Sequence, residues 1–380
     1  MRKSYKFRAY LNTEAENNTL EVLELCRQVY NLCLEQRRDT YKNLLKSVSS
    51  YTQLKQLPEL KETFPDFKRV PSQSLQDVVE RLDKAFQSFF RRIKSGDTPG
   101  YPRFKGFGRY DSLTLKQAGW ELEGSKLVVK KLGTFKVRFH RTIPKSAKIK
   151  TITIRKSITN KWYVCFSCDN VPAKVLPKSK KVVAFDVGCE SFLTDSNGLK
   201  VENPRYLKAS QDRLALLQQK LFKQTKGTKA RLKTRNRLAK VHEKISNQRL
   251  DFHHKVAKHY VDTYGKIIHE KLKSWNSFRS LNKSMRDVAW FQFFNILHCK
   301  AEEAGREVIE VNPKNTSQVC SQCGTLVKKD LSVRVHSCPH CNCSLDRDFN
   351  SALNILRLGT SLKGTSLTPV SSLPLEATGL

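Results

Sequence analysis

The sequence lacks any apolar run long enough to cross a bilayer. A membrane-spanning helix needs roughly 18 to 20 consecutive apolar residues, and charged or polar residues interrupt every stretch of the chain before that length. Residues 1–8 are basic but contain no apolar core of the kind that defines a signal peptide. We therefore expect a protein that stays inside the cell, in the cytoplasm.

Acidic residues are scarce relative to basic ones. The chain has 35 Asp plus Glu against 70 Lys plus Arg, which gives a formal net charge of +35. This charge exceeds what solubility needs and predicts a polyanionic partner held through phosphate contacts, so nucleic acid is the expected ligand. With 380 residues, 39% of them hydrophobic, the chain is long enough for two or three domains with their own cores.

The 11 cysteines are an odd number, and in a reducing compartment they are metal ligands or buried thiols rather than disulfides. Two CxxC pairs lie 14 residues apart and consist of Cys320, Cys323, Cys338 and Cys341. This spacing predicts one tetrahedral Zn²⁺ site, and four cysteines leave no position for a reactive water, so the zinc is structural. His336, His340 and Cys343 are close enough to substitute as ligands, but the complete cysteine set favours their being bystanders.

The first half of the chain predicts a β domain with a helical insertion. Residues 5–9 alternate apolar and basic side chains, as in a strand with one buried face. A capping box of Thr13 and Glu16 predicts the start of a helix, and a second helix with an aromatic stripe that reaches Phe90 and Ile93 runs from Ser72 to about residue 95. Between about residues 112 and 168 the period changes to two, which predicts a small β-barrel or sandwich that the first strand completes.

The second half predicts an α/β domain. The expected elements, in order, are a three-stranded meander over residues 182–201, a basic helical arm over 221–250, a strand at 266–270, a helix at 288–304, a strand at 307–311 and a last helix at 346–358. This order is the one expected of a ribonuclease H-like domain. The remaining residues, 359–380, are rich in Ser, Thr, Gly, Pro and Leu and are expected to be disordered.

Three acids stand at the ends of these elements: Asp186, Glu270 and Asp348. Clustered carboxylates bind Mg²⁺, and a pair of such ions activates water and stabilises the leaving oxygen in phosphodiester hydrolysis. Each acid also has an ordinary explanation, such as a turn residue before Gly188 for Asp186 or a surface side chain for Glu270. Asp346 is better explained as a helix N-cap, which leaves Asp348 as the ligand.

Two segments are candidates for nucleic-acid binding. Residues 100–110 interleave aromatic rings with cations on a glycine-rich loop, which suits base stacking and phosphate contacts. The alternative, that these aromatic residues simply pack, is equally compatible with the sequence. In the basic arm, a nearly single-signed helix face repels itself unless it meets an anion. The candidate contact residues in the two segments are Arg103, Lys105, Arg109, Lys233, Arg235, Arg237 and Arg249.

With these residues considered, the chain resembles the TnpB family of RNA-guided DNA endonucleases, which small insertion sequences encode and which are related to type V CRISPR effectors. The resemblance covers nearly the whole length. It rests on residues 5–10, 26–31, 102–105, 186–188, 237–249, 315–324 and, most specifically, on Asp346-Arg-Asp-Phe-Asn-Ser-Ala-Leu-Asn-Ile355.

The resemblance implies a multidomain α+β fold and a role for each part. Its domains would be a β-barrel wedge domain (1–12 and 97–175), a helical recognition insertion (13–96), a RuvC-like nuclease domain (180–318 and 344–358), a zinc-ribbon insertion (319–343) and a disordered tail (359–380). Asp186, Glu270 and Asp348 would hold two Mg²⁺ ions, and Arg334 would assist at the scissile phosphate. The partners would be a guide RNA from the transposon end and double-stranded target DNA, in a prokaryotic cytoplasm near the nucleoid.

By position in the family, Ser72 and Gln76 would read a short DNA motif that flanks the target. Lys271 stands where the family usually has an acid, and Asn342 where it has a glycine. Because neither change removes an expected ligand, we predict an active nuclease. Two rivals remain: a guide-dependent DNA-binding repressor or transposition helper without cleavage, and a transposase that joins DNA ends without bound RNA.

Overall fold

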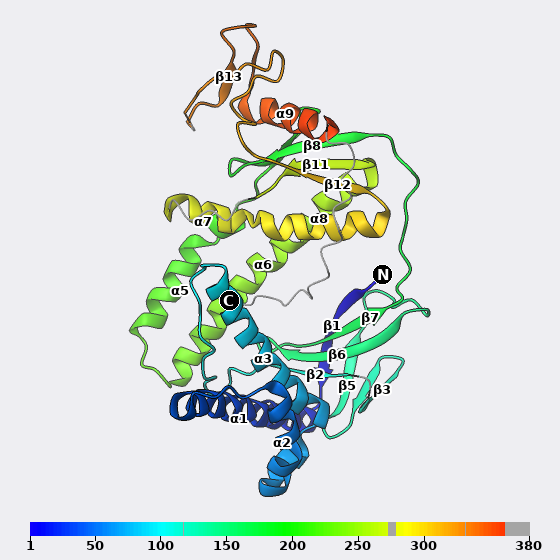
Figure 1. The fold of residues 1–380 in the computed structure, drawn as a ribbon, viewed down its shortest axis with the longest axis vertical. Coiled ribbons are helices and arrows are strands. Elements are labelled where there is room, and N and C mark those ends of the chain that lie inside the picture. The colour runs from blue at the N-terminus through cyan, green and yellow to red at the C-terminus, as the bar shows by residue number, and fades with distance from the viewer. Residues whose placement is uncertain (117, 273–278, 331, 362–380) are drawn as a thin grey trace. The chain divides into compact units, whose positions relative to one another are not determined.

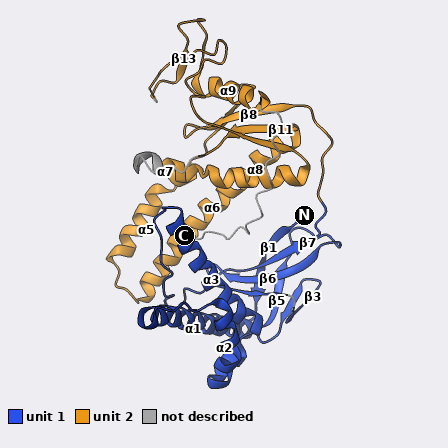
Figure 2. Cartoon of the chain, in the orientation of Figure 1, with its two compact units in different colours: residues 1–172, 374–380 blue, residues 173–373 orange. Residues whose placement is uncertain are grey.

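The computed structural model describes residues 1–116, 118–272, 279–330 and 332–361. The chain divides into two units, Met1–Pro172 and a second that begins at Ala173 (Figure 2). Each unit has its own hydrophobic core. Among the described residues, no helix is both long and apolar enough to cross a membrane.

The first unit is built on a seven-stranded sheet, counted over the described residues (Figure 1). Its strands are β1 (Lys3–Leu11), β2 (Ser112–Leu115), β3 (Trp120–Glu123), β4 (Lys126–Val129), β5 (Gly133–Arg138), β6 (Lys148–Lys156) and β7 (Trp162–Asp169). They follow the order β2-β6-β7-β1-β5-β4-β3, and every pairing is antiparallel. As predicted, β1 buries alternate side chains, Tyr5, Phe7 and Ala9.

The sheet is open rather than a closed barrel or a sandwich of two sheets, because in the described residues β2 and β3 are edges that pair on one side only. Helices complete the core instead. α1 (Thr13–Leu44) and α3 (Ser72–Lys94) share one hydrophobic cluster with the strands, and Val29, Leu82 and Phe135 are fully buried in it. The alternating pattern predicted the strand at residues 5–9 and a β region over about 112–168, but carried no information on whether the two edges meet.

The helices of the first unit differ from the prediction in three details. Asn12, not Thr13, caps α1, because the Asn12 side chain accepts the Ala15 amide at 2.8 Å. An unpredicted helix, α2 (Ser50–Thr63), and a short 3₁₀ helix (Pro65–Arg69) precede α3. The aromatic stripe of α3 is buried only as far as Phe86, since Phe90 and Ile93 are more than half exposed.

The second unit contains a five-stranded sheet whose order in the described residues is β10-β9-β8-β11-β12. The strands are β8 (Val182–Val187), β9 (Ser191–Asp195), β10 (Lys200–Glu202), β11 (Lys266–Glu270) and β12 (Glu307–Val311). β8, β9 and β10 form the predicted antiparallel meander, whereas β11 is parallel to both β8 and β12. The carboxyl ends of β8 and β11 therefore meet at one edge of the sheet.

Helices cover both faces of this sheet. Those described are α4 (Tyr206–Ala209), α5 (Gln211–Lys223), α6 (Lys229–Thr263), α7 (Arg279–Val288), α8 (Trp290–Ala304) and α9 (Arg347–Ser361). On one face Phe185 packs with Tyr260 of α6 and Phe293 of α8. On the other, Ala184 and Ile268 pack with Ile355 of α9. α9 extends past the predicted end at 358, and residues 362–380 of the predicted tail lie outside the described residues.

Between β12 and α9 the chain carries the cysteine pairs and a small hairpin of β13 (Val335–Ser337) and β14 (Ser344–Asp346). The hairpin runs straight into α9, since β14 ends one residue before that helix begins. The cysteine insertion is thus connected directly to the helix that carries Asp348.

Candidate functional site

The three acids that the sequence singled out lie at one edge of the second sheet. Asp186 is the fifth residue of β8, Glu270 is the last of β11, and Asp348 is the second of α9. The parallel register pairs Phe185 with His269, so the next residue on each strand, Asp186 and Glu270, turns to the face that α9 covers. Asp348 comes from α9 itself.

The electrostatics show that the three carboxyl groups interact. The pKa of Asp186 is raised well above its usual 3.8, first by burial and then by repulsion from Glu270 and from Asp348. Some solvent still reaches the Asp186 side chain, so its carboxyl group is crowded by protein rather than sealed off. Burial also raises the pKa of Glu270, although a hydrogen bond from the Thr316 hydroxyl opposes the rise. Negative charge on the carboxyl groups at this edge is therefore energetically unfavourable.

At the start of α9, Asp346 caps the helix, as predicted. Asp346 Oδ1 accepts the amides of Asp348 and Phe349 at 3.0 and 3.1 Å, which is an N-cap. Partial burial would raise the pKa of Asp346, but bonds from Lys200 and from the Phe349 amide outweigh it and lower that pKa. Asp348 is left to point at the edge, paired with Arg347 at 3.2 Å.

The acids are grouped more loosely than a single-ion site. Among the described residues, the sets whose ligand atoms all lie within 4.8 Å of one another are the four cysteines and a His-His-Glu set, and the three acids are not among them. Acids that share a pair of ions held about 3.5–4 Å apart need not converge on one point.

The four predicted cysteines converge. Cys320 Sγ lies 3.6 Å from Cys341 Sγ, and Cys323 Sγ lies 3.5 Å from Cys338 Sγ. Four sulfurs about 2.3 Å from a tetrahedral Zn²⁺ are about 3.8 Å apart, so a small outward shift of these two pairs fits them to the ion. Hydrogen bonding with Thr325 lowers the pKa of Cys323 to about 6, which favours the thiolate that binds metal.

Two tight turns form the cysteine cluster. The Gly324 amide donates to the Cys320 carbonyl and the Asn342 amide to the Cys338 carbonyl, both at 2.9 Å. Gly324 and Asn342 have φ of 79° and 56°, and asparagine tolerates this left-handed conformation better than most residues. Asn342 in place of glycine is therefore compatible with the turn.

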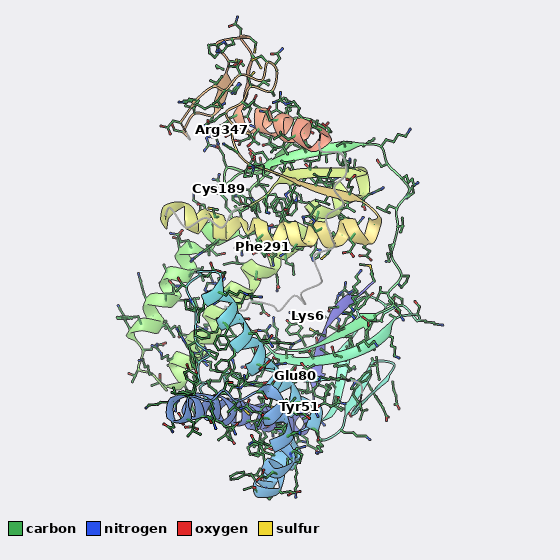
Figure 3. The ribbon with its side chains drawn as sticks, viewed as in Figure 1. Lys6, Tyr51, Glu80, Cys189, Phe291 and Arg347 are labelled. Carbon is green, nitrogen blue, oxygen red and sulfur yellow. The ribbon has the colours of Figure 1, made fainter. Side chains whose placement is uncertain are left out.

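Arg334, the predicted helper, lies in the cysteine insertion beside the β8–β9 turn. Its Nε is 3.2 Å from Glu190 Oε2, and both side chains are more than half exposed. Figure 3 labels Cys189 of this turn and Arg347 of α9, which flank the acid edge. A Cβ on Gly188 in the same turn would lie 3.8 Å from Asp348 Oδ2, so the turn borders the acids.

The aromatic loop of the first unit is partly packed and partly exposed. Asn31 fixes its backbone through two bonds to Lys105, with the side-chain amide donating to the carbonyl at 3.0 Å and the side-chain oxygen accepting the amide at 2.8 Å. Tyr110 is buried, whereas Phe107 is 86% exposed and Phe104 is 46% exposed. Arg103 and Arg109 are also exposed. The loop therefore presents rings and cations outward on a fixed backbone.

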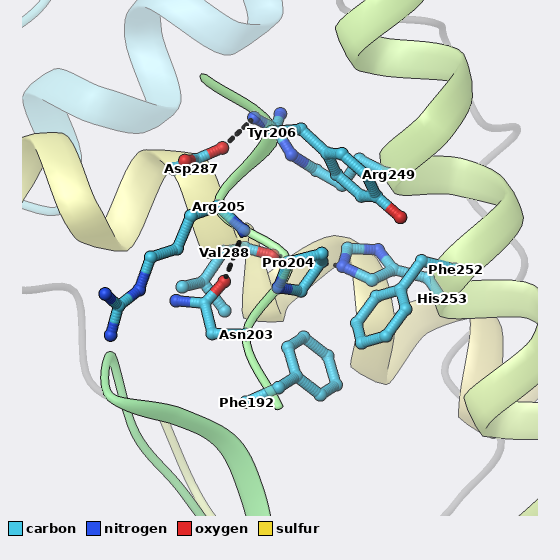
Figure 4. A pocket seen from close by; sticks show the side chains of 10 residues that line it. All are labelled: Phe192, Asn203, Pro204, Arg205, Tyr206, Arg249, Phe252, His253, Asp287 and Val288. Atoms are coloured by element: carbon cyan, nitrogen blue, oxygen red, sulfur yellow. Dashed lines mark hydrogen bonds and ion pairs between the residues drawn. The ribbon is translucent and has the colours of Figure 1, made fainter. Parts of the chain in front are cut away.

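The four predicted residues of the basic arm have two different environments. Lys233, Arg235 and Arg237 are exposed on α6. Arg249, in contrast, pairs with Asp287 at 3.0 Å and lines a small pocket (Figure 4). Its charge already has a partner within the second unit, so the first three residues are the better candidates for phosphate contacts.

Ser72 and Gln76 are both exposed, one turn apart at the start of α3. The Ser72 hydroxyl accepts a bond from Lys61 Nζ at 2.7 Å. The buried residues of this helix, such as Leu75 and Val79, face the core. Ser72 and Gln76 thus share an accessible face next to a cation.

The sequence did not predict the His-His-Glu set, which consists of His269, His298 and Glu310. Burial lowers the pKa of His269 to about 3, so its ring is neutral at physiological pH. The three residues come from different elements and have no short spacing that would mark them in the sequence.

Comparisons with known proteins agree with the resemblance. A family model described as a probable transposase of the IS605 OrfB type matches residues 164–280, one described as a Cas12f1-like TNB domain matches 290–355, and one described as a helix-turn-helix domain matches 1–46. In this chain residues 1–46 form a strand and one long helix. Two of these models, over residues 1–46 and 164–280, are of the IS605 OrfB type, so the chain resembles this family of insertion-sequence proteins.

Curated relatives match over nearly the whole chain. A putative RNA-guided DNA endonuclease of Streptomyces pristinaespiralis is 29% identical over 367 residues, which is 94% of this chain and 90% of the relative. The putative RNA-guided DNA endonuclease InsQ of Escherichia coli K12 is 27% identical, over 98% of this chain and 96% of the relative. The solved structure of a Cas12f1–sgRNA–target DNA complex gives a TM-score of 0.50 at 16% identity, covering 93% of this chain and 98% of that protein. This last likeness shows a shared α+β fold.

Proposed function

We propose that the protein is an RNA-guided, Mg²⁺-dependent endonuclease, encoded by an insertion sequence, that cleaves DNA next to a short flanking motif. The two full-length relatives carry the name of RNA-guided DNA endonuclease, which supports the guide and the substrate. In this proposal the first unit supplies the wedge sheet and its helical recognition insertion, and the second supplies the RuvC-like nuclease with its zinc ribbon.

The observation that carries the proposal is the gathering of Asp186, Glu270 and Asp348 at one sheet edge, where burial and then repulsion raise the pKa of Asp186. Crowded carboxylates of one sign are unfavourable unless a cation neutralises them. Their oxygens are the ligand type that Mg²⁺ prefers, which makes the donor set suitable for that ion. The strand order β10-β9-β8-β11-β12 is also the order of a ribonuclease H-like sheet.

When bound, Mg²⁺ supplies the positive charge that polarises a phosphodiester and activates water. The chain positions the carboxylates for this. Thr316 orients Glu270 through its hydroxyl, and the cap that Asp346 makes fixes the first turn of α9 and with it Asp348. Arg334, exposed beside Glu190, is placed to contact a phosphate that reaches the edge.

The remaining predicted contacts divide by type. Lys233, Arg235 and Arg237 are suited to the phosphates of the guide RNA or of its duplex with DNA. Exposed Phe107 and Arg109 are suited to stacking and backbone contacts with an unpaired strand. Ser72 and Gln76 would read the flanking motif in double-stranded target DNA. The cysteine cluster would hold a structural Zn²⁺.

The direct test is plasmid cleavage. The protein, purified with its native RNA, is given a plasmid that matches the guide, with Mg²⁺ or with EDTA. We expect cleavage only with Mg²⁺ and none with Asp186→Asn, which keeps the size of the side chain and removes its charge. Asp251→Asn is the matched control, because Asp251 is an exposed acid of the same unit whose only role seen here is an ion pair with Lys255 at 2.6 Å.

Two results would contradict the proposal. Cleavage that persists in Asp186→Asn would remove the acid edge from the mechanism. Cleavage that proceeds equally after RNase treatment would remove the guide and favour a transposase. RNA-dependent DNA binding without any cleavage would instead favour a repressor or transposition helper.

A further inference from the structure

A second group of metal-ligand side chains lies on the face of the second sheet opposite the acids. His269 precedes Glu270 on β11 and turns to the other face, where it stacks on Phe294 of α8 with ring centroids 4.0 Å apart. Glu310 is its register partner on the neighbouring strand β12, and His298 reaches it from α8. Two parallel strands and one helix therefore present three ligand side chains to one point.

The distances are those of a coordination site. His269 Nε2 lies 3.2 Å from His298 Nε2, which lies 3.6 Å from Glu310 Oε1, and one ligand atom from each residue is within 4.8 Å of the others. Two nitrogens about 2.0–2.1 Å from a tetrahedral Zn²⁺ are about 3.3 Å apart. The wider separation to the carboxylate leaves room for it to adjust. Two histidines and one carboxylate form a donor set that suits Zn²⁺ and its neighbours in the first transition series.

The tautomer of His269 also favours a ligand. Its Nδ1 lies 2.9 Å from the Glu270 carbonyl oxygen, and because a carbonyl can only accept, Nδ1 carries the proton. Nε2 is left with a free lone pair aimed at His298. A histidine that donates its other nitrogen to a carbonyl is the usual arrangement of a metal-bound imidazole.

One residue of the His-His-Glu set is buried, and the other two are partly exposed to solvent. His269 is buried against the rings of Phe185 and Phe294. The His298 and Glu310 side chains are 38% and 33% exposed, so an ion and a water can reach them. This combination allows metal to enter without unfolding the sheet.

We propose that His269, His298 and Glu310 bind a divalent transition metal such as Zn²⁺, with a fourth position open to water. This site is separate from the cysteine cluster and from the acid edge. The ion ties α8 to β11 and β12, and through the bond from His269 to the Glu270 carbonyl it fixes the end of the strand that carries Glu270. It is a positioning site, and its existence does not depend on the proposed nuclease activity.

The test is the zinc content of the whole protein. The protein is equilibrated with Zn²⁺, separated from free ion and measured by mass spectrometry, with every variant in an Asp186→Asn background so that zinc at the acid edge contributes little. We expect two zinc ions per chain without further change, and one in His298→Gln and in Glu310→Gln. His242→Gln, which alters an exposed histidine of α6, should keep two.

Cobalt separates the two sites in the same samples. Co²⁺ bound by thiolates gives an intense sulfur-to-metal absorption, whereas Co²⁺ bound by nitrogen and oxygen does not. We expect loss of the weaker nitrogen-oxygen spectrum alone in His298→Gln. One zinc per chain in the parent, or two that persist in both His298→Gln and Glu310→Gln, would overturn the proposal; the first result would mean that the two histidines share a proton instead.

Discussion

Replacement of Asp186 by asparagine should stabilise the metal-free protein while it abolishes cleavage. In the folded state, burial and repulsion from Glu270 and Asp348 raise the pKa of Asp186 above 3.8, so the charged form is disfavoured relative to the unfolded chain. Each unit of such a difference corresponds to about 1.4 kcal/mol. One kcal/mol moves the Tm of a domain of 150–250 residues by about 2–4 °C. Because some solvent still reaches Asp186, we expect a modest rise in Tm in EDTA at pH 7, of about 2–4 °C for each kcal/mol of relieved repulsion and burial.

The pH dependence gives the sign of this effect. An acid whose pKa is raised by folding binds more protons in the folded state, so stability falls as pH rises from about 4 through the folded-state pKa. The difference in Tm between Asp186→Asn and the parent should therefore be small near pH 4 and grow towards pH 7. Differential scanning fluorimetry in EDTA measures it directly.

Asp348→Asn is the matched comparison. Asp348 has Arg347 at 3.2 Å, so its neutralisation also removes an ion pair and should raise the Tm less than Asp186→Asn. Addition of Mg²⁺ should raise the Tm of the parent and have a smaller effect on Asp186→Asn, because bound cation relieves the same repulsion. An unchanged or lower Tm for Asp186→Asn in EDTA would refute this account of the edge.

Three further predictions concern other parts of the molecule. Gly359→Ala should lower the Tm by a few degrees, because the new Cβ would lie 2.7 Å from Ile268 Cδ1 and overpacking costs about 1–3 kcal/mol; calorimetry showing a higher Tm would contradict it. Cys323→Ser should lose the cysteine-bound zinc and expose the insertion to protease, while α9 and the sheet remain folded; metal analysis with limited proteolysis measures this, and unaltered zinc content would count against it. Replacement of Lys233 and Arg235 by alanine should reduce the slope of log K for RNA against log salt by about 0.7–0.9 per residue, and an unchanged slope in a titration would show that α6 does not contact phosphate.

The sequence predicted those parts of the fold that depend on local pattern. Short apolar runs bounded by turns located the meander of β8, β9 and β10, and the buried stripe of α1 located that helix. It missed α2 because the apolar stripe of that helix is short: Leu57 is buried, and Leu54 and Leu60 pack partly buried against the core. Polar contacts add to this packing, including a bond from Arg37 Nε to Gln53 at 2.9 Å, and so short a stripe gives periodicity little to detect.

The candidate sites also differ in how far the sequence alone could predict them. Cysteine spacing located the cysteine cluster, since ligands on two tight turns are close in sequence. The only sequence signal for the three acids was their position at the ends of predicted elements. Their proximity in the structure depends on the fold. The pair of Arg249 with Asp287, and the meeting of His269 with His298, join residues from different elements and required coordinates.

β1 lies in the middle of its sheet, between β7 and β5, although it is the first of the seven strands along the chain. The last of its partners, β7, ends at Asp169, so at synthesis rates of about 5–20 residues per second the strand waits on the order of ten seconds for its second neighbour. Until then the edge that β7 will cover is open to other chains, and the other edge is open until β5 pairs with it. Newly made protein should therefore depend on chaperones or on early pairing with β5, and slow translation before residue 169 should increase its aggregation.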